Sequence, residues 1–343
     1  MHSLPPVAPS YIHELLGSLL IEGPDACGFL NRLLTLKVSA LSPGEGSPAH
    51  LLDSTGKLAA SLYLLRLSGD RWLALPRTLS AAELGERLEL YHFGERLAFN
   101  ASDELRGLRV ICERQDAPRA LESLCSSAAH SEVDALEPVS AGERGWRALA
   151  GAPEGQTLWR AARWSRGTRL IELELRAEGA ALSAAAERLE AQGFSALGAE
   201  GAEALRVRLG APGAPELLPS YTPLDVEGTR ALISVSEGKG CYPGQETIER
   251  TLALGQPARA LVHLRLEGHG GAVEELSAGL SLWSDEAEPR ELGQLSSVSP
   301  PLPGEPRYAL AMVKRKAQAL SRLKSEGGQL FIVLSSDDSE AER

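Results

Sequence analysis

One short stretch, GKGCYPGQETIER from Gly238 to Arg250, concentrates residues that could do chemistry. Cys241 can serve as a nucleophile or a ligand, and Lys239 lies two residues before it. Pro243 is typical of the first turn of a helix, where its missing N–H costs nothing. No helix breaker follows between Gln245 and Leu254. We therefore expect a helix to begin here, with Cys241 at or just before its N-terminus.

Such a position would favour the thiolate form of Cys241. The unpaired N–H groups at the start of a helix and the positive end of its dipole stabilise an anion, and Lys239 adds a positive charge. Gly240 lets the backbone turn and, without a side chain, lets a ligand approach closely. Gln245 and Glu246 can bind polar groups or satisfy donors of the first helical turn. The stretch is therefore a candidate site.

Each of these features also has a purely structural interpretation. A lone cysteine is commonly a small buried hydrophobic residue, the role that we assign to Cys27, Cys112 and Cys125. Glu246 and Arg250 have i,i+4 spacing, so we expect them to pair, and alone they would be a surface ion pair. The four cysteines form no C-x-x-C motif, and no nearby histidine pair completes a zinc pattern. We predict no metal site.

Composition restricts the function classes. With 343 residues, 43% of them hydrophobic, the chain is too long for one ordinary core, so we expect two or three domains. The net charge of -11 repels a phosphate backbone, so we expect no direct nucleic-acid binding. The N-terminus lacks a basic segment, and its apolar run is short and contains Gly17. We read neither a signal peptide nor a membrane span, and expect a cytoplasmic protein.

Strand and helix patterns occur in the same order twice. A helix is expected from Asp25, its cap, with Phe29, Leu33, Leu36 and Val38 on one apolar face. Three strands then follow within residues 50–76, separated by turns. The next predicted helix is capped by Ser80, and its candidates for burial are Leu79, Leu84, Leu88 and Leu90.

Residues 145–193 repeat this order of three strands and a helix. Two related α+β units would explain the repeat, although many α+β proteins alternate in this way. A Pro/Gly-rich connector and a short strand at Ala231–Ser236 precede the candidate site. Beyond Gly255 only short strand patterns remain. They predict an all-β C-terminal domain, a small barrel.

The K-G-C-Y-P-G-Q-E stretch followed by Arg250 resembles the signature of the YgfZ family of folate-binding proteins, relatives of the glycine-cleavage T protein, an aminomethyltransferase. TPLDVEG is similar to the family's Pro-Leu-Glu segment, with Asp225 in the acidic position. The resemblance covers nearly the whole chain and is densest at 217–255.

The resemblance implies a fold and its limits. It implies two ferredoxin-like α+β units in a folate-binding-like region at 1–255, with about 46–130 as the inserted unit. A C-terminal β-barrel at 256–336 and an acidic tail at 337–343 follow. The units and the barrel are expected to form a ring around a channel that holds tetrahydrofolate or a derivative. The fold class that we predict is therefore α+β, with duplicated units plus a barrel.

The resemblance also implies a role. It implies folate binding and maintenance of iron–sulfur enzymes, including ones that modify tRNA, with a part for the signature cysteine. A pterin offers N–H donors that suit the carboxylate of Asp225, and its glutamate tail suits Lys239 or Arg250. Its flat face suits the aromatic ring of Tyr242. Whether Cys241 is a nucleophile, a cluster contact or a redox sensor stays open.

Two departures from the family pattern bear on folate. Where the family has Thr-Asn-Asp after the first helix, this chain has Thr35, Leu36 and Lys37. Asp225 is one methylene shorter than the usual glutamate. Three hypotheses follow: a folate-binding accessory protein for iron–sulfur enzymes, an aminomethyl-type one-carbon transferase, and a scaffold that has lost folate. The usual T-protein pattern lacks K-G-C-Y, which favours the first over the second.

Overall fold

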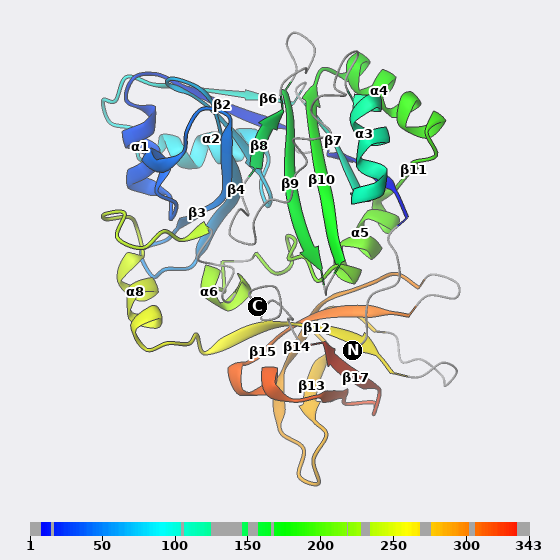
Figure 1. Ribbon diagram of the computed structural model, residues 1–343. Helices are drawn as coiled ribbons and strands as arrows, with labels where there is room; N and C mark the ends of the chain where they lie inside the picture. Colours follow the sequence, from blue (N-terminus) through cyan, green and yellow to red (C-terminus); the bar gives the residue numbers. More distant parts are fainter. Residues whose placement is uncertain are drawn as a thin grey trace.

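Three parts of the chain meet in the molecule, for which we have a computed structural model (Figure 1). Two α+β lobes lie side by side, and a β-barrel lies below both of them in this view. The structure describes residues 8–14, 17–103, 106–124, 146–149, 157–165, 168–217, 219–227, 234–267, 276–301 and 306–334.

The first lobe is built from one continuous stretch of chain. Its elements are β2 (Ser18–Glu22), α1 (Ala26–Leu33), the 3-10 turn η1 (Val38–Ala40), β3 (Glu45–Leu52), β4 (Leu58–Ser68), β5 (Arg71–Pro76), α2 (Ala81–Glu89) and β6 (Ala98–Ser102). β3, β4 and β5 pair antiparallel in chain order, and β2 and β6 extend the sheet beyond β5. The helices and strands bury a shared core that includes Phe29, Trp72 and Leu84.

The second lobe takes elements from both sides of the first one. They are β1 (Ser10–Glu14), β7 (Arg106–Glu113), η2 (Arg114–Asp116), α3 (Ala117–Leu124), β8 (Trp146–Leu149), β9 (Thr157–Ser165), β10 (Thr168–Ala177), α4 (Gly179–Ala191) and β11 (Ser195–Ala196). α3 and α4 share an apolar core with β7 and β10 that includes Val110, Leu173 and Leu189. β8 pairs with β3, so the described strands of both lobes form one sheet in the order β11-β1-β7-β10-β9-β8-β3-β4-β5-β2-β6.

The barrel follows at the C-terminal end of the chain. Its elements are β12 (Arg259–Leu266), β13 (Ser281–Ser284), β14 (Glu291–Val298), β15 (Tyr308–Lys314), η6 (Arg315–Ala319), β16 (Arg322–Ser325) and β17 (Leu330–Leu334). The described strands close in the order β12-β15-β14-β13-β16-β17 around a core that includes Leu264, Leu282 and Phe331. The two sheet-based lobes and this barrel confirm the predicted fold class. The domain limits, including an inserted unit at about 46–130, stay a prediction.

Short helices between the second lobe and the barrel join the three parts. α5 (Ala199–Arg208) contributes Leu205 and Val207 to a core that also holds Leu170 of the second lobe and Leu310 of the barrel. α6 (Pro223–Glu227) and α8 (Gln245–Ala253) contribute to another core, which we call the junction core. Its members come from the first lobe, the connector, the signature and the barrel, and are Leu52, Leu58, Leu217, Tyr221, Leu224, Val226, Val235, Tyr242, Ile248 and Met312. These apolar contacts seat the barrel against both lobes.

Several local predictions need correction. Asp25 stands at the N-cap of α1, but its carboxylate accepts from Arg96, at 2.8 Å from the Arg96 backbone N, and caps no helix N–H. α1 ends at Leu33, so the buried Leu36 and Val38 pack beyond the helix. Their apolar pattern reflects the core rather than helical periodicity.

The second predicted helix is right in its cap and wrong in one buried position. Ser80 forms a full capping box with Glu83, which satisfies donors at both ends of the first turn. Leu84 and Leu88 are buried, whereas Leu90 is exposed because α2 ends at Glu89. Leu90 follows the last helical residue, so its side chain does not lie on the buried face of α2.

Two strand predictions near the site and in the barrel also change. Ser234 is helical and Val235 and Ser236 lie in irregular chain, so the described part of 231–236 holds no strand. The barrel contains β16, a strand that the sequence patterns did not reveal. Its RLKS sequence alternates too weakly over four residues to be recognised.

A close contact between two glycines fixes the signature against the first lobe. Gly244 has φ +74°, and a Cβ there would lie 2.5 Å from Asp53 O and 2.6 Å from Gly56 Cα. Gly56 belongs to the turn between β3 and β4 and also has a positive φ. A side chain at Gly244 would meet backbone that cannot move away without moving the turn.

We predict that Gly244→Ala lowers the free energy of unfolding by about 2 kcal/mol or more, because a left-handed alanine and a backbone clash add together. Gly238→Ala is the matched control, since Gly238 has φ +64° and open space around its Cβ position. It should lose only about 1 kcal/mol. Urea denaturation measures both, and equal losses would contradict the packing argument.

Candidate functional site

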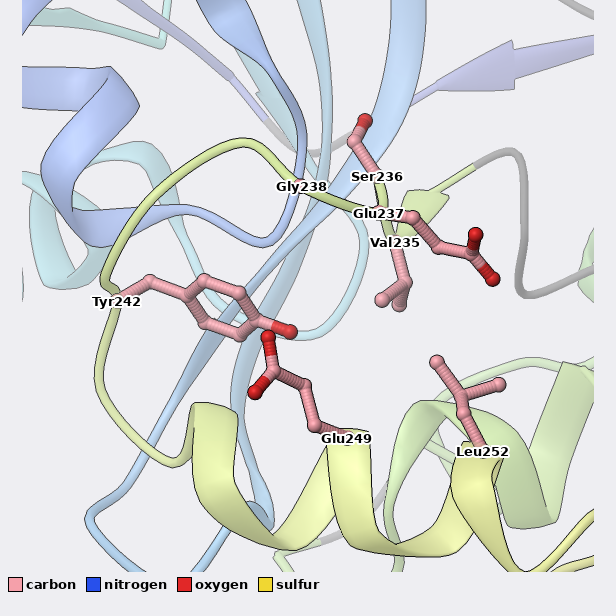
Figure 2. A pocket seen from close by; sticks show the side chains of 7 residues that line it. All are labelled: Val235, Ser236, Glu237, Gly238, Tyr242, Glu249 and Leu252. Atoms are coloured by element: carbon pink, nitrogen blue, oxygen red, sulfur yellow. The ribbon is translucent and has the colours of Figure 1, made fainter.

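The signature runs through a loop before it enters α8. We call residues 236–244 the signature loop (Figure 2). α8 begins at Gln245 with Gly244 as its N-cap, so Pro243 precedes the helix instead of starting it. Cys241 is an exposed free thiol three residues before the cap. The helix thus begins where the sequence predicts, and Cys241 comes before it, separated from the cap by Tyr242 and Pro243.

Lys239 points back into the first lobe. Its residue is 8% exposed, and its Nζ donates to the Asn31 backbone O at 2.6 Å. Asn31 lies in the last turn of α1, where carbonyl groups lack helical partners and favour a cation. Burial lowers the pKa of Lys239 to about 8, against a smaller opposite effect of Cys241. Lys239 thus ties the loop to α1.

Tyr242 lies in the junction core. The residue is 8% exposed, and the Lys239 Nζ sits 4.7 Å from its ring centroid. Burial, followed by the charge of Glu249, raises the pKa of Tyr242 to about 12. The hydroxyl therefore stays protonated at neutral pH. One face of the Tyr242 ring is beside the Lys239 ammonium, and the ring packs in the junction core. A ligand can therefore reach the hydroxyl edge of Tyr242 more readily than a flat face of its ring.

The chain before the signature loop is fastened to the first lobe through Thr35. The Thr35 hydroxyl donates to Ser234 O at 2.6 Å, and Ser236 N donates to Thr35 O at 3.0 Å. Lys37 N donates to the Ser236 hydroxyl at 2.9 Å. Leu36, one of the departures from the family pattern, is buried in the core of the first lobe. Thr35 and Lys37 therefore position the loop through hydrogen bonds.

Asp225 lies in the first turn of α6. Its Oδ2 accepts from Thr222 N and from the Thr222 hydroxyl, both at 2.9 Å, and Asp225 N donates to the same hydroxyl. These reciprocal bonds form a capping arrangement. No described residue hydrogen-bonds to Oδ1. Asp225 is buried beside the junction core and keeps one carboxylate oxygen available for a ligand.

The remaining predicted residues lie on α8. Gln245 Nε2 donates to the Glu249 carboxylate. Glu246 and Arg250 form the expected i,i+4 ion pair at 2.5 Å, with side chains 84% and 69% exposed. They face solvent, so the pair itself has the weak, screened character of a surface ion pair. Gly240 is exposed, has φ +100°, and has open space where a Cβ would stand.

Sequence reasoning missed a buried polar cluster beside α6. His50 Nδ1 lies 2.8 Å from the Ser61 hydroxyl, and His50 Nε2 lies 3.3 Å from Glu227 Oε1. Arg77 Nη1 is 3.8 Å from the same oxygen, and the Ser234 hydroxyl donates to Glu227 Oε2 at 2.6 Å.

This cluster joins α6 to the first lobe. Burial alone would raise the pKa of Glu227, but the facing His50, with Arg77, holds it below its usual value. In the sequence, the one indication that Glu227 belongs to the site is its position two residues after Asp225. Distance along the chain hid the rest, because His50 lies on β3 and Arg77 directly follows β5, both far from Glu227 in the sequence.

The described residues also bear on metal binding and membrane insertion. No group of three or more His, Cys, Asp and Glu among them is placed to hold a metal ion. Within the same part of the chain, every helix is too short or too polar to cross a membrane. Cys112 is buried and Cys27 packs at the edge of the first core, while Cys125 lies outside the described residues.

The residues present fit a reduced folate in part. A buried carboxylate with a free oxygen at Asp225 suits the N–H donors of a pterin. Arg250 is an exposed cation that suits a carboxylate tail, whereas Lys239 already donates to a carbonyl. The structure brings Lys239 and Tyr242 into contact and leaves Arg250 and Glu246 on the outer face of α8.

Lobes, barrel and docked loop together define a fold of the aminomethyltransferase T type. The crystal structure of glycine cleavage system aminomethyltransferase T from Bartonella henselae matches it with a TM-score of 0.76. That match covers 97% of this chain and 86% of the other, at 17% sequence identity, and shows the fold alone.

Sequence comparison points the same way over a shorter stretch. The chain is 32% identical over 113 residues to a probable aminomethyltransferase from Natronomonas pharaonis. The match spans 32% of this chain and 31% of that protein, so the chain matches about a third of its relative's length. No protein-family model matches. The chain is similar to aminomethyltransferases, and the narrower resemblance to YgfZ proteins stays a hypothesis.

The buried lysine predicts a pH dependence of stability. Between about pH 8 and 10.5 the folded Lys239 is largely neutral while the unfolded one is still charged. The unfolded state then binds more protons, so the free energy of unfolding rises with pH in this window. Wild type should gain stability relative to Lys239→Met from pH 8 to pH 10 in urea denaturation. A constant difference between the two proteins would contradict this.

Proposed function

We propose that this chain binds tetrahydrofolate or a derivative where the lobes, the barrel and α6 meet. The observation that carries the proposal is the match to an aminomethyltransferase T fold over 97% of the chain. Leu224 and Val226, which flank Asp225, share the junction core with Tyr242 of the signature loop, and this nearness supports a common site. The second support is the sequence similarity to a probable aminomethyltransferase.

Within this proposal, Asp225 contacts the pterin and a cation contacts the glutamate tail. The free Oδ1 of Asp225 supports the first contact. For the second, both candidate cations already have a partner, Arg250 in the ion pair with Glu246 and Lys239 at the Asn31 carbonyl, and Arg250 is the more exposed of the two. Gly240, Tyr242, Gln245 and Glu246 complete the proposed folate-binding set.

The finer part of the proposal is an accessory role for iron–sulfur enzymes, including enzymes that modify tRNA. Its support is Cys241, an exposed thiol on a loop whose neighbours Lys239 and Tyr242 are buried. One thiolate cannot hold a cluster alone, because clusters take four ligands. Cys241 would therefore contact a cluster or a client enzyme transiently. We place this activity in the cytoplasm.

Aminomethyl-type one-carbon transfer is the alternative. It is favoured by the names of both similar proteins, one an aminomethyltransferase T and one a probable aminomethyltransferase. The two functions differ in what they need from Cys241, because the signature thiol belongs to the accessory hypothesis alone. A scaffold without folate remains the third hypothesis, and Leu36 and Lys37 are the departures that motivate it.

Calorimetric titration with tetrahydrofolate tests the folate proposal. We expect binding by the wild type, weakened roughly tenfold or more in Asp225→Asn, because a hydrogen bond to a charged group is lost. Thr222→Ala is the control, since it breaks the cap of α6 and keeps the carboxylate. Equal affinity of Asp225→Asn and wild type would remove Asp225 from the site, and no binding by the wild type would favour the scaffold.

Substitution of Cys241 distinguishes the accessory role for iron–sulfur enzymes from aminomethyl-type one-carbon transfer. Cys241→Ser should leave the free energy of unfolding within about 0.5 kcal/mol, because the residue is exposed. In cells it should reduce iron–sulfur enzyme activity, while Cys27→Ser should not. Purified protein with tetrahydrofolate and an aminomethylated donor should form no 5,10-methylene-tetrahydrofolate. Turnover in that assay, together with full activity of Cys241→Ser cells, would establish the alternative.

A further inference from the structure

A small pocket lies between the signature loop and α8 (Figure 2). Its volume is about 170 Å³, and its lining consists of Val235, Ser236, Glu237, Gly238, Tyr242, Glu249 and Leu252. Pockets for drug-sized ligands measure roughly 300–1,000 Å³. This pocket is therefore too small for a whole folate and suits a single short group.

The two charged residues that line the pocket, Glu237 and Glu249, are both acidic. Figure 2 shows the carboxylates of Glu237 and Glu249 on different sides of the pocket, with the Tyr242 hydroxyl pointing toward Glu249. Val235 and Leu252 supply apolar surface between them. No lysine, arginine or histidine is among the lining residues. Such a lining favours a cation that carries a short aliphatic portion.

The Tyr242 hydroxyl is the strongest sign that the pocket takes a ligand. Tyr242 is 8% exposed, and its hydroxyl hydrogen-bonds to no described residue. The hydroxyl oxygen is not one of the fully buried polar atoms of the described residues, so it opens onto the pocket and can meet a ligand or an ordered water there. The hydroxyl can accept from an ammonium and donate to the adjacent carboxylate in the same arrangement.

Neighbouring groups leave the acidic character intact. Lys239 keeps its charge near the Tyr242 ring while its Nζ donates to the Asn31 carbonyl, but it does not line the pocket, and the two lining carboxylates outweigh this one ammonium. Gln245 uses one oxygen of the Glu249 carboxylate, and carboxylate oxygens each offer a second lone pair. Glu237 is an exposed residue, so its carboxylate is reachable from solvent.

We propose that this pocket binds a primary alkylammonium group, held by the carboxylate of Glu249 and the hydroxyl of Tyr242, which lie beside each other, with the charge of Glu237 on the opposite side adding to the attraction. Val235 and Leu252 contact its methylene groups. The ammonium comes from a free small amine or from the end of a lysine side chain on a partner protein. This inference goes beyond folate binding, because the anionic glutamate tail of a folate would be repelled here.

Ligand-observed NMR with n-butylammonium tests the proposal on the full chain at pH 7. Neutral n-butanol is the matched probe, with the same carbon chain and no charge. We expect butylammonium to bind and butanol to bind at least tenfold more weakly. Tyr242→Phe, Glu237→Gln and Glu249→Gln should each weaken butylammonium binding several-fold. Glu86→Gln, an equal change of charge on the exposed face of α2, should not.

Equal signals from butylammonium and butanol would overturn the proposal, as would unchanged binding in all three pocket variants. Tyr242→Phe keeps the buried ring, and circular dichroism with thermal unfolding verifies that each variant is folded. A lysine-containing peptide compared with its acetyl-lysine form distinguishes the sources. Tighter binding of the peptide than of butylammonium indicates a protein partner, and the reverse indicates a free amine. Tetrahydrofolate titration of Glu237→Gln and Glu249→Gln, which lie outside the proposed folate-binding set, reports separately on the folate proposal.

Discussion

The seating of the signature loop on the first lobe is the contact on which the rest of the site depends. Gly244 packs backbone to backbone against Gly56, and Tyr242 and Ile248 enter the junction core with Leu52 and Leu58. Because the same core includes Met312 of the barrel, the loop is held by two parts of the molecule at once. Its conformation is set by packing that a shift of either part would disturb.

This seating sorts the signature residues into two groups. Lys239 and Tyr242 turn inward, where they link α1, the junction core and the pocket beside α8. Cys241 turns outward between them, so the thiol is displayed on a loop that its neighbours immobilise. An exposed thiol on a fixed backbone loses little conformational freedom when it meets a partner. The loop backbone is thus held in place by Lys239 and Tyr242, while the thiol of Cys241 is accessible to a partner.

The sequence predicts the fold more fully than the site, for physical reasons. Strands β3 to β5 and β8 to β10 carry strong local patterns and Gly-containing turns, and Ser80 with Glu83 marks a helix start unambiguously. Local spacing also predicts the Glu246–Arg250 pair. The His50–Glu227 contact joins residues far apart in the chain, and no periodicity encodes it.

The position of Cys241 relative to α8 shows where local signals stop being sufficient. Proline before a run of helix formers indicates a helix start, yet the chain inserts a turn with Gly244 in the left-handed region. The Gly56 contact selects that turn, and it is a tertiary contact. The proposed folate contacts depend in the same way on tertiary packing, because packing decides which polar side chains near the junction core are left without a protein partner.

The first lobe interrupts the second in the chain, and this affects how the protein folds. β1 (Ser10–Glu14) is made early in synthesis, but its partners β7 (Arg106–Glu113) and β11 (Ser195–Ala196) come much later. The first lobe, whose elements are contiguous from β2 to β6, can complete its core in the meantime. A folded lobe between β1 and β7 brings their ends together and shortens the loop that must close. Early folding of the first lobe thus supplies the template on which the second sheet half is completed, and β1 stays an unpaired strand edge until then.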